Sequence, residues 1–151
     1  MIDTKKLTAK DLMIGDYMKY KDGTIVRIVR VGDVSPMDAP IYCHTQLEGY
    51  FPCQLSDISS IPLTAEILEK NGFSELMEHD EWSRIFRAYH DDLFIEVGIY
   101  EPMFINIGYV DKEGEEQPLS NIVKVHGENF FVHELQHALR LCGINDKEIV
   151  L

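Results

Sequence analysis

Short runs of β-branched and aromatic residues alternate with turn residues in the first third of the chain. Two such runs, residues 16–20 and 24–31, are separated by an Asp-Gly pair, which in that position predicts a hairpin. Two further strands are expected at residues 41–47 and 50–55. Four short strands in succession predict a small barrel or half-barrel in this part of the chain.

Two later segments show the periodicity and the end signals of helices. Residues 63–72 are expected to form a short helix, because Thr64 can cap its first turn and Gly72 can end it in the left-handed conformation. Residues 130–142 place apolar side chains three and four positions apart and are followed by Gly143. This second segment is the longest predicted helix.

Between the two helices the pattern is that of an antiparallel sheet. Residues 93–100 and 103–110 are rich in Ile, Phe, Tyr and Val and are joined by a Glu-Pro reversal. Residues 82–89 alternate in a similar way, although a helix in this segment is an alternative. An acidic turn is predicted at 111–117 and a further strand at 122–125.

Together these elements predict an α+β fold in two parts. Residues 1–61 form a small, barrel-like β subdomain, and residues 62–151 form an α+β subdomain whose carboxy-terminal helix packs on the antiparallel sheet. A single continuous domain is the alternative, since 151 residues are close to the modal size of one domain.

The charge balance bears on the kind of partner. The chain has 14 Lys and Arg against 26 Asp and Glu, a net charge of -12, whereas a nucleic-acid-binding surface needs a positive field. Nucleic acid is therefore a poor candidate for the partner. Mimicry of nucleic acid, in which an acidic fold occupies a basic groove, is the least supported of three function classes.

The sequence gives no sign of export or of membrane insertion. No apolar signal segment follows the lysines near the start, and the apolar stretch 93–110 is interrupted by charged residues and a proline before it could span a bilayer. Three cysteines, Cys43, Cys53 and Cys142, are too few for a disulfide framework. We therefore expect a cytoplasmic protein with reduced thiols.

One motif carries recognisable chemistry. The sequence HELQH at residues 133–137 matches the H-E-x-x-H pattern, in which two histidines four residues apart lie on one helix face and bind zinc. In that interpretation His133 and His137 are the ligands, Glu134 polarises the metal-bound water, and the protein is a small zinc-dependent hydrolase. On a helical wheel both histidines point away from the apolar face.

A catalytic zinc also needs a third protein ligand. No histidine follows His137, and Asp146 and Glu148 come just after the predicted end of the helix. Upstream, His90 and His126 are the candidates for the third ligand. We therefore prefer the interpretation that the motif is coincidental, with no catalytic residue, no metal ligand and no cofactor. The zinc site is kept as the alternative.

Other residue types that could form a site are weaker candidates. Cys43, His44 and Cys53 lack the spacing of zinc-binding cysteines, and the acidic pairs 91–92 and 115–116 are typical of solvated turns. No glycine-rich phosphate loop and no nucleophile motif occur in the sequence. Four tyrosines of the predicted amino-terminal strands are interpreted as core residues rather than as a binding surface: Tyr17, Tyr20, Tyr42 and Tyr50.

Three stretches resemble a family of short uncharacterised proteins of Bacteroidales gut bacteria, their phages and their conjugative elements. They are DLMIGDYMKYKDGTIVRIVRV at residues 11–31, ISSIPLTAEILEKNGF at 58–73 and FFVHELQHALRLCGI at 130–144, in the family's order. The Pro-Leu-Thr start of the first helix and the V-H-x-L-Q pattern carry most of the resemblance. In that family the positions of Glu134 and His137 more usually hold Gln and Asn, which implies that the motif is not a hydrolase signature.

Sequence and resemblance together predict a non-enzymatic accessory or interaction protein of a mobile element or phage. It is expected to act through contacts with another protein, with neither nucleic acid nor a membrane as its partner. The zinc-dependent hydrolase that uses His133, Glu134 and His137 is the alternative.

Overall fold

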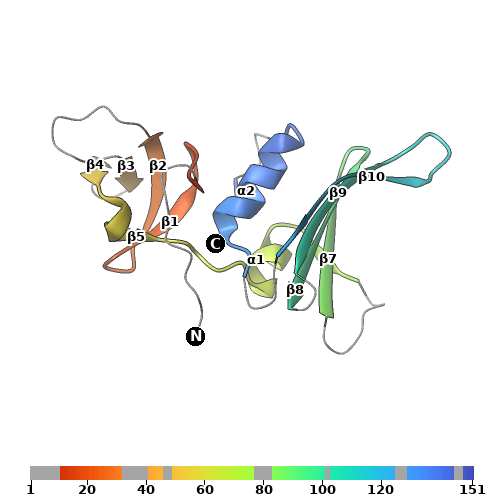
Figure 1. The fold of residues 1–151 in the computed structure, drawn as a ribbon, viewed down its shortest axis with the longest axis horizontal. Helices are drawn as coiled ribbons and strands as arrows, with labels where there is room; N and C mark the ends of the chain where they lie inside the picture. The colour runs from red at the N-terminus through yellow and green to blue at the C-terminus, as the bar shows by residue number, and fades with distance from the viewer. Residues whose placement is uncertain are drawn as a thin grey trace. The chain divides into compact units, whose positions relative to one another are not determined.

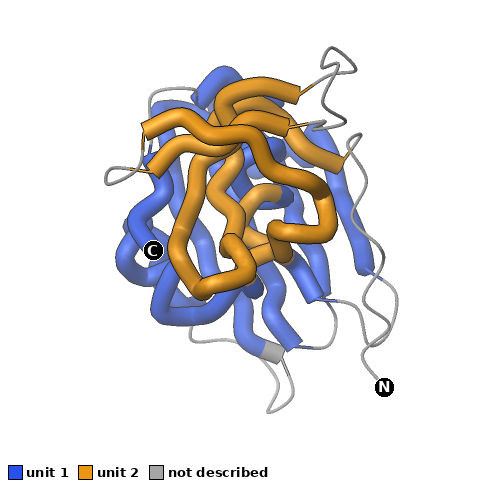
Figure 2. Tube along the Cα trace, turned by 90° about the vertical axis from the view of Figure 1, so that its left-hand side faces the viewer, with its two compact units in different colours: residues 1–2, 62–130, 134–151 blue, residues 3–61, 131–133 orange. Residues whose placement is uncertain are grey.

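The computed structural model describes residues 11–31, 41–45, 49–76, 83–100, 103–124, 129–144 and 148–151. The chain divides into two compact units (Figure 2). Unit 1 comprises residues 1–2, 62–130 and 134–151, and unit 2 comprises residues 3–61 and 131–133. Two antiparallel sheets and two α-helices make up the described structure, which confirms the predicted α+β class.

Unit 2 contains an antiparallel sheet of five strands in the order β4-β3-β2-β1-β5 (Figure 1). Its elements are β1 (Tyr17–Tyr20), β2 (Ile25–Val31), β3 (Ile41–Thr45), β4 (Gly49–Cys53), the 3-10 helix η2 (Leu55–Asp57) and β5 (Ile58–Ser59). The order is open, because β4 and β5 stand at opposite edges and do not pair with each other in the described strands. Closure into a barrel therefore stays a prediction.

The first hairpin is shaped by its two turn residues. Gly23 has a φ of +93°, which a glycine adopts without strain, and the carboxylate of Asp22 accepts a hydrogen bond of 2.8 Å from the backbone N–H of Thr24. The predicted hairpin is confirmed. The core of unit 2 is built from buried side chains of its strands: Met18, Val26, Ile28, Ile41, Cys43, Cys53 and Ile58.

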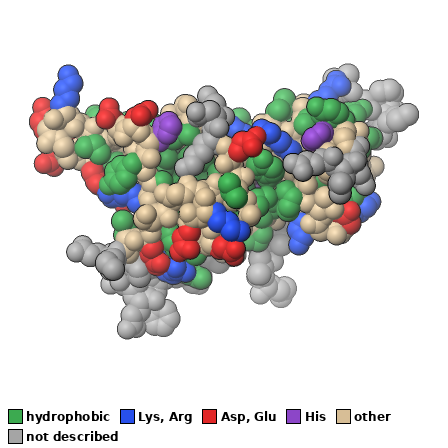
Figure 3. Space-filling view, turned by 180° about the vertical axis from the view of Figure 1, so that it is seen from behind, with side chains coloured by type: hydrophobic (Ala, Val, Ile, Leu, Met, Phe, Trp, Pro, Cys, Tyr) green, Lys and Arg blue, Asp and Glu red, His purple; other side chains and the backbone are tan. Residues whose placement is uncertain are grey.

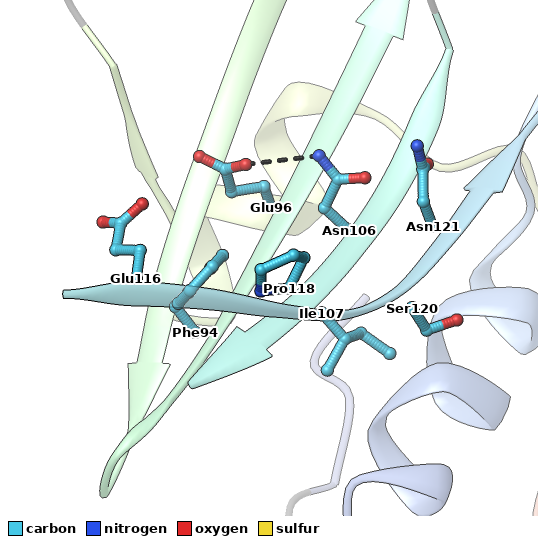
Figure 4. Close-up of a pocket in the computed structure, with 8 residues that line it drawn as sticks. All are labelled: Phe94, Glu96, Asn106, Ile107, Glu116, Pro118, Ser120 and Asn121. Atoms are coloured by element: carbon cyan, nitrogen blue, oxygen red, sulfur yellow. Dashed lines mark hydrogen bonds between the residues drawn. The ribbon is translucent and has the colours of Figure 1, made fainter. Parts of the chain in front are cut away.

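Unit 1 contains the second antiparallel sheet, in the order β10-β9-β8-β7-β6, together with one α-helix and, from Glu134 onward, the other (Figure 1). Its elements are α1 (Ala65–Lys70), β6 (Ser74–Glu75), β7 (Ser83–His90), β8 (Leu93–Tyr100), β9 (Phe104–Val110), β10 (Glu116–Val123) and α2 (Val132–Leu141). α1 lies behind this sheet in the view of Figure 4. None of the helices in the described ranges is long and apolar enough to cross a membrane.

Two expectations for this sheet need correction. Residues 83–90 form β7, so the alternative of a helix there is wrong. β10 begins at Glu116, well before residue 122, because its pairing with β9 continues through Pro118 with a register shift between Pro118 and Ser120. The intrinsic preference of a segment is a poor guide where hydrogen bonds to a neighbouring strand fix its conformation.

α1 begins at its predicted cap, and each α-helix is followed by its predicted glycine. The hydroxyl oxygen of Thr64 accepts a hydrogen bond of 3.3 Å from the backbone N–H of residue 67 and caps α1. Gly72 and Gly143 follow the two helices with φ values of +83° and +77°. In each case the next residue donates its N–H back into the helix, to the carbonyls of Leu68 (3.1 Å) and Leu139 (3.0 Å), which is the Schellman arrangement.

Candidate functional site

The histidines of the HELQH motif lie in the first half of α2, in different environments. His133 is 4% exposed, and its ring stacks on Phe131 with 5.9 Å between centroids and 7° between planes. His137 is half-buried. The expectation that both point away from the interior is therefore wrong for His133. The helical wheel predicts the apolar face of α2 correctly, but His133 and Gln136 on the polar side of this helix are buried as well.

Glu134 is held in an ion pair. Its Oε1 lies 2.5 Å from Nζ of Lys124, and the two side chains are only 27% and 17% exposed. Lys124 directly follows β10, and its ammonium group lies 5.2 Å from the ring centroid of Phe130. The pair joins the end of β10 to the start of α2, so the carboxylate that a hydrolase would use as its base makes a structural contact here.

The candidate third ligands do not complete a metal site in the part of the chain that is described. His126 lies outside the described residues, and His90 stands at the end of β7 with its side chain 45% exposed and 3.9 Å from the carboxylate of Asp91. No group of three or more His, Cys, Asp or Glu side chains in the described ranges is arranged to hold a metal ion. The zinc site stays a prediction.

The cysteines of unit 2 are core residues. Cys43 and Cys53 are buried on β3 and β4, and the thiol of Cys43 donates a hydrogen bond to the sulfur of Cys53. This bond, together with burial, raises the pKa of Cys43, and the same bond lowers the pKa of Cys53. His44 lies instead against Tyr50, with 4.8 Å between ring centroids. Cys43, His44 and Cys53 therefore do not form a common site.

The tyrosines of unit 2 are less buried than the core interpretation predicts, although Tyr20 packs against the core. Tyr50 is 74% exposed, and the other three are half-buried. Each of these three contacts a cation, since the guanidinium of Arg27 lies 5.8 Å from the ring centroid of Tyr17, Nζ of Lys21 lies 5.3 Å from that of Tyr20, and the guanidinium of Arg30 lies 5.7 Å from that of Tyr42. The core interpretation is therefore wrong for Tyr50 and incomplete for the others.

A polar row that was not predicted from the sequence crosses the sheet of unit 1. The register places Ser74, Arg87, Glu96, Asn106 and Asn121 opposite one another on five neighbouring strands. In Figure 4, Glu96, Asn106 and Asn121 stand on the viewer's side of the sheet, with α1 behind it. The sequence contains an indication of this polar row, since Glu96 and Asn106 each interrupt an otherwise apolar strand.

Arg87 stands within this row between two carboxylates. Its guanidinium donates hydrogen bonds to Glu96 and Glu116. It also donates to the hydroxyl of Tyr89 at 2.9 Å and lies 5.0 Å from the ring centroid of Phe94. Burial by itself would lower the pKa of Arg87, but the hydrogen bonds to Glu96, Tyr89 and Glu116 outweigh it and raise the pKa. Arg87 is a fixed positive charge that holds β7, β8 and β10 together.

A pocket of about 280 Å³ opens beside the row, over β8, β9 and β10 (Figure 4). Its polar walls include Glu96, Asn106, Glu116 and Asn121. Asn106 donates a hydrogen bond of 3.4 Å to Glu96, whereas its buried Oδ1 has no hydrogen-bond partner among the described residues. Carboxylates and amide carbonyls are acceptors, so the pocket favours a group that donates hydrogen bonds.

β10 forms one edge of the unit 1 sheet and is exposed along almost its whole length. Every residue of it except Gln117 is exposed. Leu119 is 59%, Ile122 39% and Val123 61% exposed, which is unusual for apolar side chains gathered on one strand. In the described part of the chain β9 is its one partner strand. An edge strand directs alternate backbone N–H and C=O groups away from its neighbour, where they can pair with another chain.

The end of the sheet at which β10 begins is acidic. Residues 91–92 join β7 to β8 and residues 111–115 join β9 to β10, and the two turns are adjacent because the N–H of Val110 donates to the carbonyl of Asp92 at 2.8 Å. Figure 3 shows acidic side chains gathered around the projecting turn. The charged residues here are six carboxylates and one lysine: Asp91, Asp92, Asp111, Glu113, Glu115, Glu116 and Lys112.

Comparison of the chain with known protein families, with curated proteins and with solved structures finds no match. The resemblance to the Bacteroidales family therefore stays a prediction.

Proposed function

We propose that the protein is a non-enzymatic accessory protein of a mobile element or phage, and that it acts by binding another protein. The link to mobile elements rests on the resemblance of residues 11–31, 58–73 and 130–144. Binding rests on one observation, the exposed apolar edge strand β10. The half-buried ion pair of Glu134 with Lys124 supports a structural role for the HELQH segment.

Exposed apolar side chains on an edge strand are costly for a protein that has no partner for them. Such edges template the addition of a further strand, and natural proteins usually protect them with charges, prolines or bulges. Pro118 and the register shift at Leu119 interrupt the pairing of β10 with β9, but no further proline occurs in residues 119–123. This second half is therefore the part of β10 that can accept a partner strand.

A library of random peptides displayed on yeast cells tests the proposal. The full chain, labelled with a fluorophore, should select peptides whose binding weakens in the double variant Leu119→Thr/Val123→Thr, because threonine keeps the strand preference and removes apolar contact area. Tyr50→Ala, at a strongly exposed position of unit 2, is the matched control and should bind as the wild type does. Selected peptides that bind the double variant equally well would contradict the proposal.

A further inference from the structure

The position of the acidic end relative to β10 bears on which partner the edge fits. β10 starts at Glu116, directly after the acidic turn, and runs away from it toward Val123. At the rise of about 3.3 Å per residue of a strand, the accepting residues 119–123 begin only about 10 Å from Glu116. A strand added along this half and extending by a few residues would therefore pass the carboxylates of the turn.

The carboxylates at this end are accessible. Glu113, Glu115 and Glu116 are exposed, and so are Asp91 and Asp92 of the adjacent turn. Asp111 differs, because hydrogen bonds from Gln117 and from backbone N–H groups of the turn engage it and lower its pKa. Arg87 is committed to Glu96 and Glu116, so Lys112 is the one basic side chain within the two turns. The local field at the start of β10 is therefore strongly negative.

We infer that β10 binds an extended segment of a partner protein that is apolar where it covers residues 119–123 and carries Lys or Arg where it passes the acidic turn. This inference rests on the proposed function and adds the chemistry of the partner. Backbone hydrogen bonds to the edge supply the docking geometry, and charge complementarity selects the basic segment. The acceptor-rich pocket beside Glu116 can receive a donating side chain of the same segment.

A second copy of the chain is a poorer occupant on the same grounds. Pairing of β10 with another β10 would bring a further acidic turn toward the sheet, in a chain whose net charge is already -12. Like charges placed together oppose association. Self-association through β10 is therefore one of the outcomes that the experiment must detect.

The test uses two synthetic peptides that differ only in charge, KTKVTVTVKTK and ETEVTVTVETE. Binding to the full chain is followed by fluorescence anisotropy, and the bound position is read from the backbone amide shifts of a nitrogen-15-labelled sample. In buffer of about 20 mM ionic strength the basic peptide should bind at least about tenfold more tightly, and this preference should shrink at physiological salt, where charges are screened beyond about 8 Å. The shifts should centre on residues 119–123.

Two double variants separate the contribution of charge from that of the strand. Glu113→Gln/Glu115→Gln should raise the Kd of the basic peptide about threefold, since each exposed charge contributes only a small part of the binding free energy. Glu66→Gln/Glu69→Gln makes the same charge change on α1 and should leave the Kd unchanged. Leu119→Thr/Val123→Thr should weaken both peptides.

The outcomes separate this inference from the proposed function. Equal binding of both peptides at residues 119–123 would overturn the basic partner and leave the edge-binding function standing. Binding of the basic peptide to residues 111–116 alone, unaffected by Leu119→Thr/Val123→Thr, would overturn strand addition. Dimers of the free chain with shifts on β10 would make a second copy the occupant and overturn the inference. Failure of both peptides to bind would also overturn the inference. If the display selection also yielded no binding peptide, the proposed function would be contradicted as well.

Discussion

Phe94 of β8 stands opposite Gly108 of β9, and its ring occupies the space that a side chain at position 108 would need. A Cβ atom at Gly108 would overlap the ring and lie 2.6 Å from the carbonyl oxygen of Gln117 on β10. The glycine thus lets the ring pack against the middle of the sheet, where Phe94 is only 6% exposed on the face that carries the polar row. Aromatic side chains over strand glycines are a recurrent device for fixing register.

Gly108→Ala should therefore destabilise the protein. We expect a loss of about 1–3 kcal/mol in the free energy of unfolding, because an added methyl group in a packed site forces neighbours to move. Urea titration followed by fluorescence measures it. In a Phe94→Leu background the same substitution should cost less, since one of the two overlaps is removed. An unchanged midpoint for Gly108→Ala would show that the close contact is wrong.

Arg87→Met should also destabilise the protein, because it removes the ion-pair partner of the Glu96 carboxylate. Glu96 is 15% exposed on its side chain and would lose its cation, which costs about 1–3 kcal/mol in the free energy of unfolding. Arg84→Met is the matched control, because Arg84 pairs with Glu75 at a more exposed position, with side chains 35% and 30% exposed. Its cost should be below about 1 kcal/mol. Equal costs for the two variants would contradict a special role for Arg87.

Features that depend on neighbouring residues could be predicted from the sequence. The turn at Gly23 and the helix ends at Gly72 and Gly143 lie where they were predicted, since a positive φ and a few local hydrogen bonds decide them. The strands β8 and β9 were also predicted within a residue of their bounds. Each is a run of β-branched and aromatic residues long enough to outweigh its polar member.

Features that depend on register or on a second packed surface could not be predicted. The polar row brings Arg87, Glu96, Asn106 and Asn121 together only because four strands align at those residues. The early start of β10 depends on pairing with β9 rather than on its own composition. The burial of His133 was missed because helical periodicity reveals the apolar side but cannot show that polar residues are covered too.

Metal analysis tests the interpretation of the HELQH motif. We expect protein purified without chelator to contain well below one zinc per chain, and EDTA to leave the melting temperature unchanged, because a structural zinc would contribute directly to folding. His137→Asn should melt at the wild-type temperature. A content near one zinc per chain that is lost in His137→Asn, with the fold intact, would establish the alternative zinc site.

Acid should remove part of the stability of unit 2. Backbone hydrogen bonding at Gln54 and a side-chain bond from Lys21 lower the pKa of Asp57. Because the folded pKa lies below the unfolded value of about 3.9, the contribution of Asp57 is complete above about pH 4 and is lost as the pH falls through the folded pKa. Asp57→Asn should therefore flatten the dependence of unfolding free energy on pH below about pH 4. An identical profile in the variant would contradict this linkage.

Amide hydrogen exchange gives the most direct test of strand addition at β10. It is measured on the full chain alone and saturated with the tightest peptide from the display selection. Added backbone hydrogen bonds should slow exchange at alternate amides of residues 119–123 by at least about tenfold, while β4, an edge of the other sheet, should exchange as before. Unchanged exchange at residues 119–123, or slowing confined to other segments, would contradict the account.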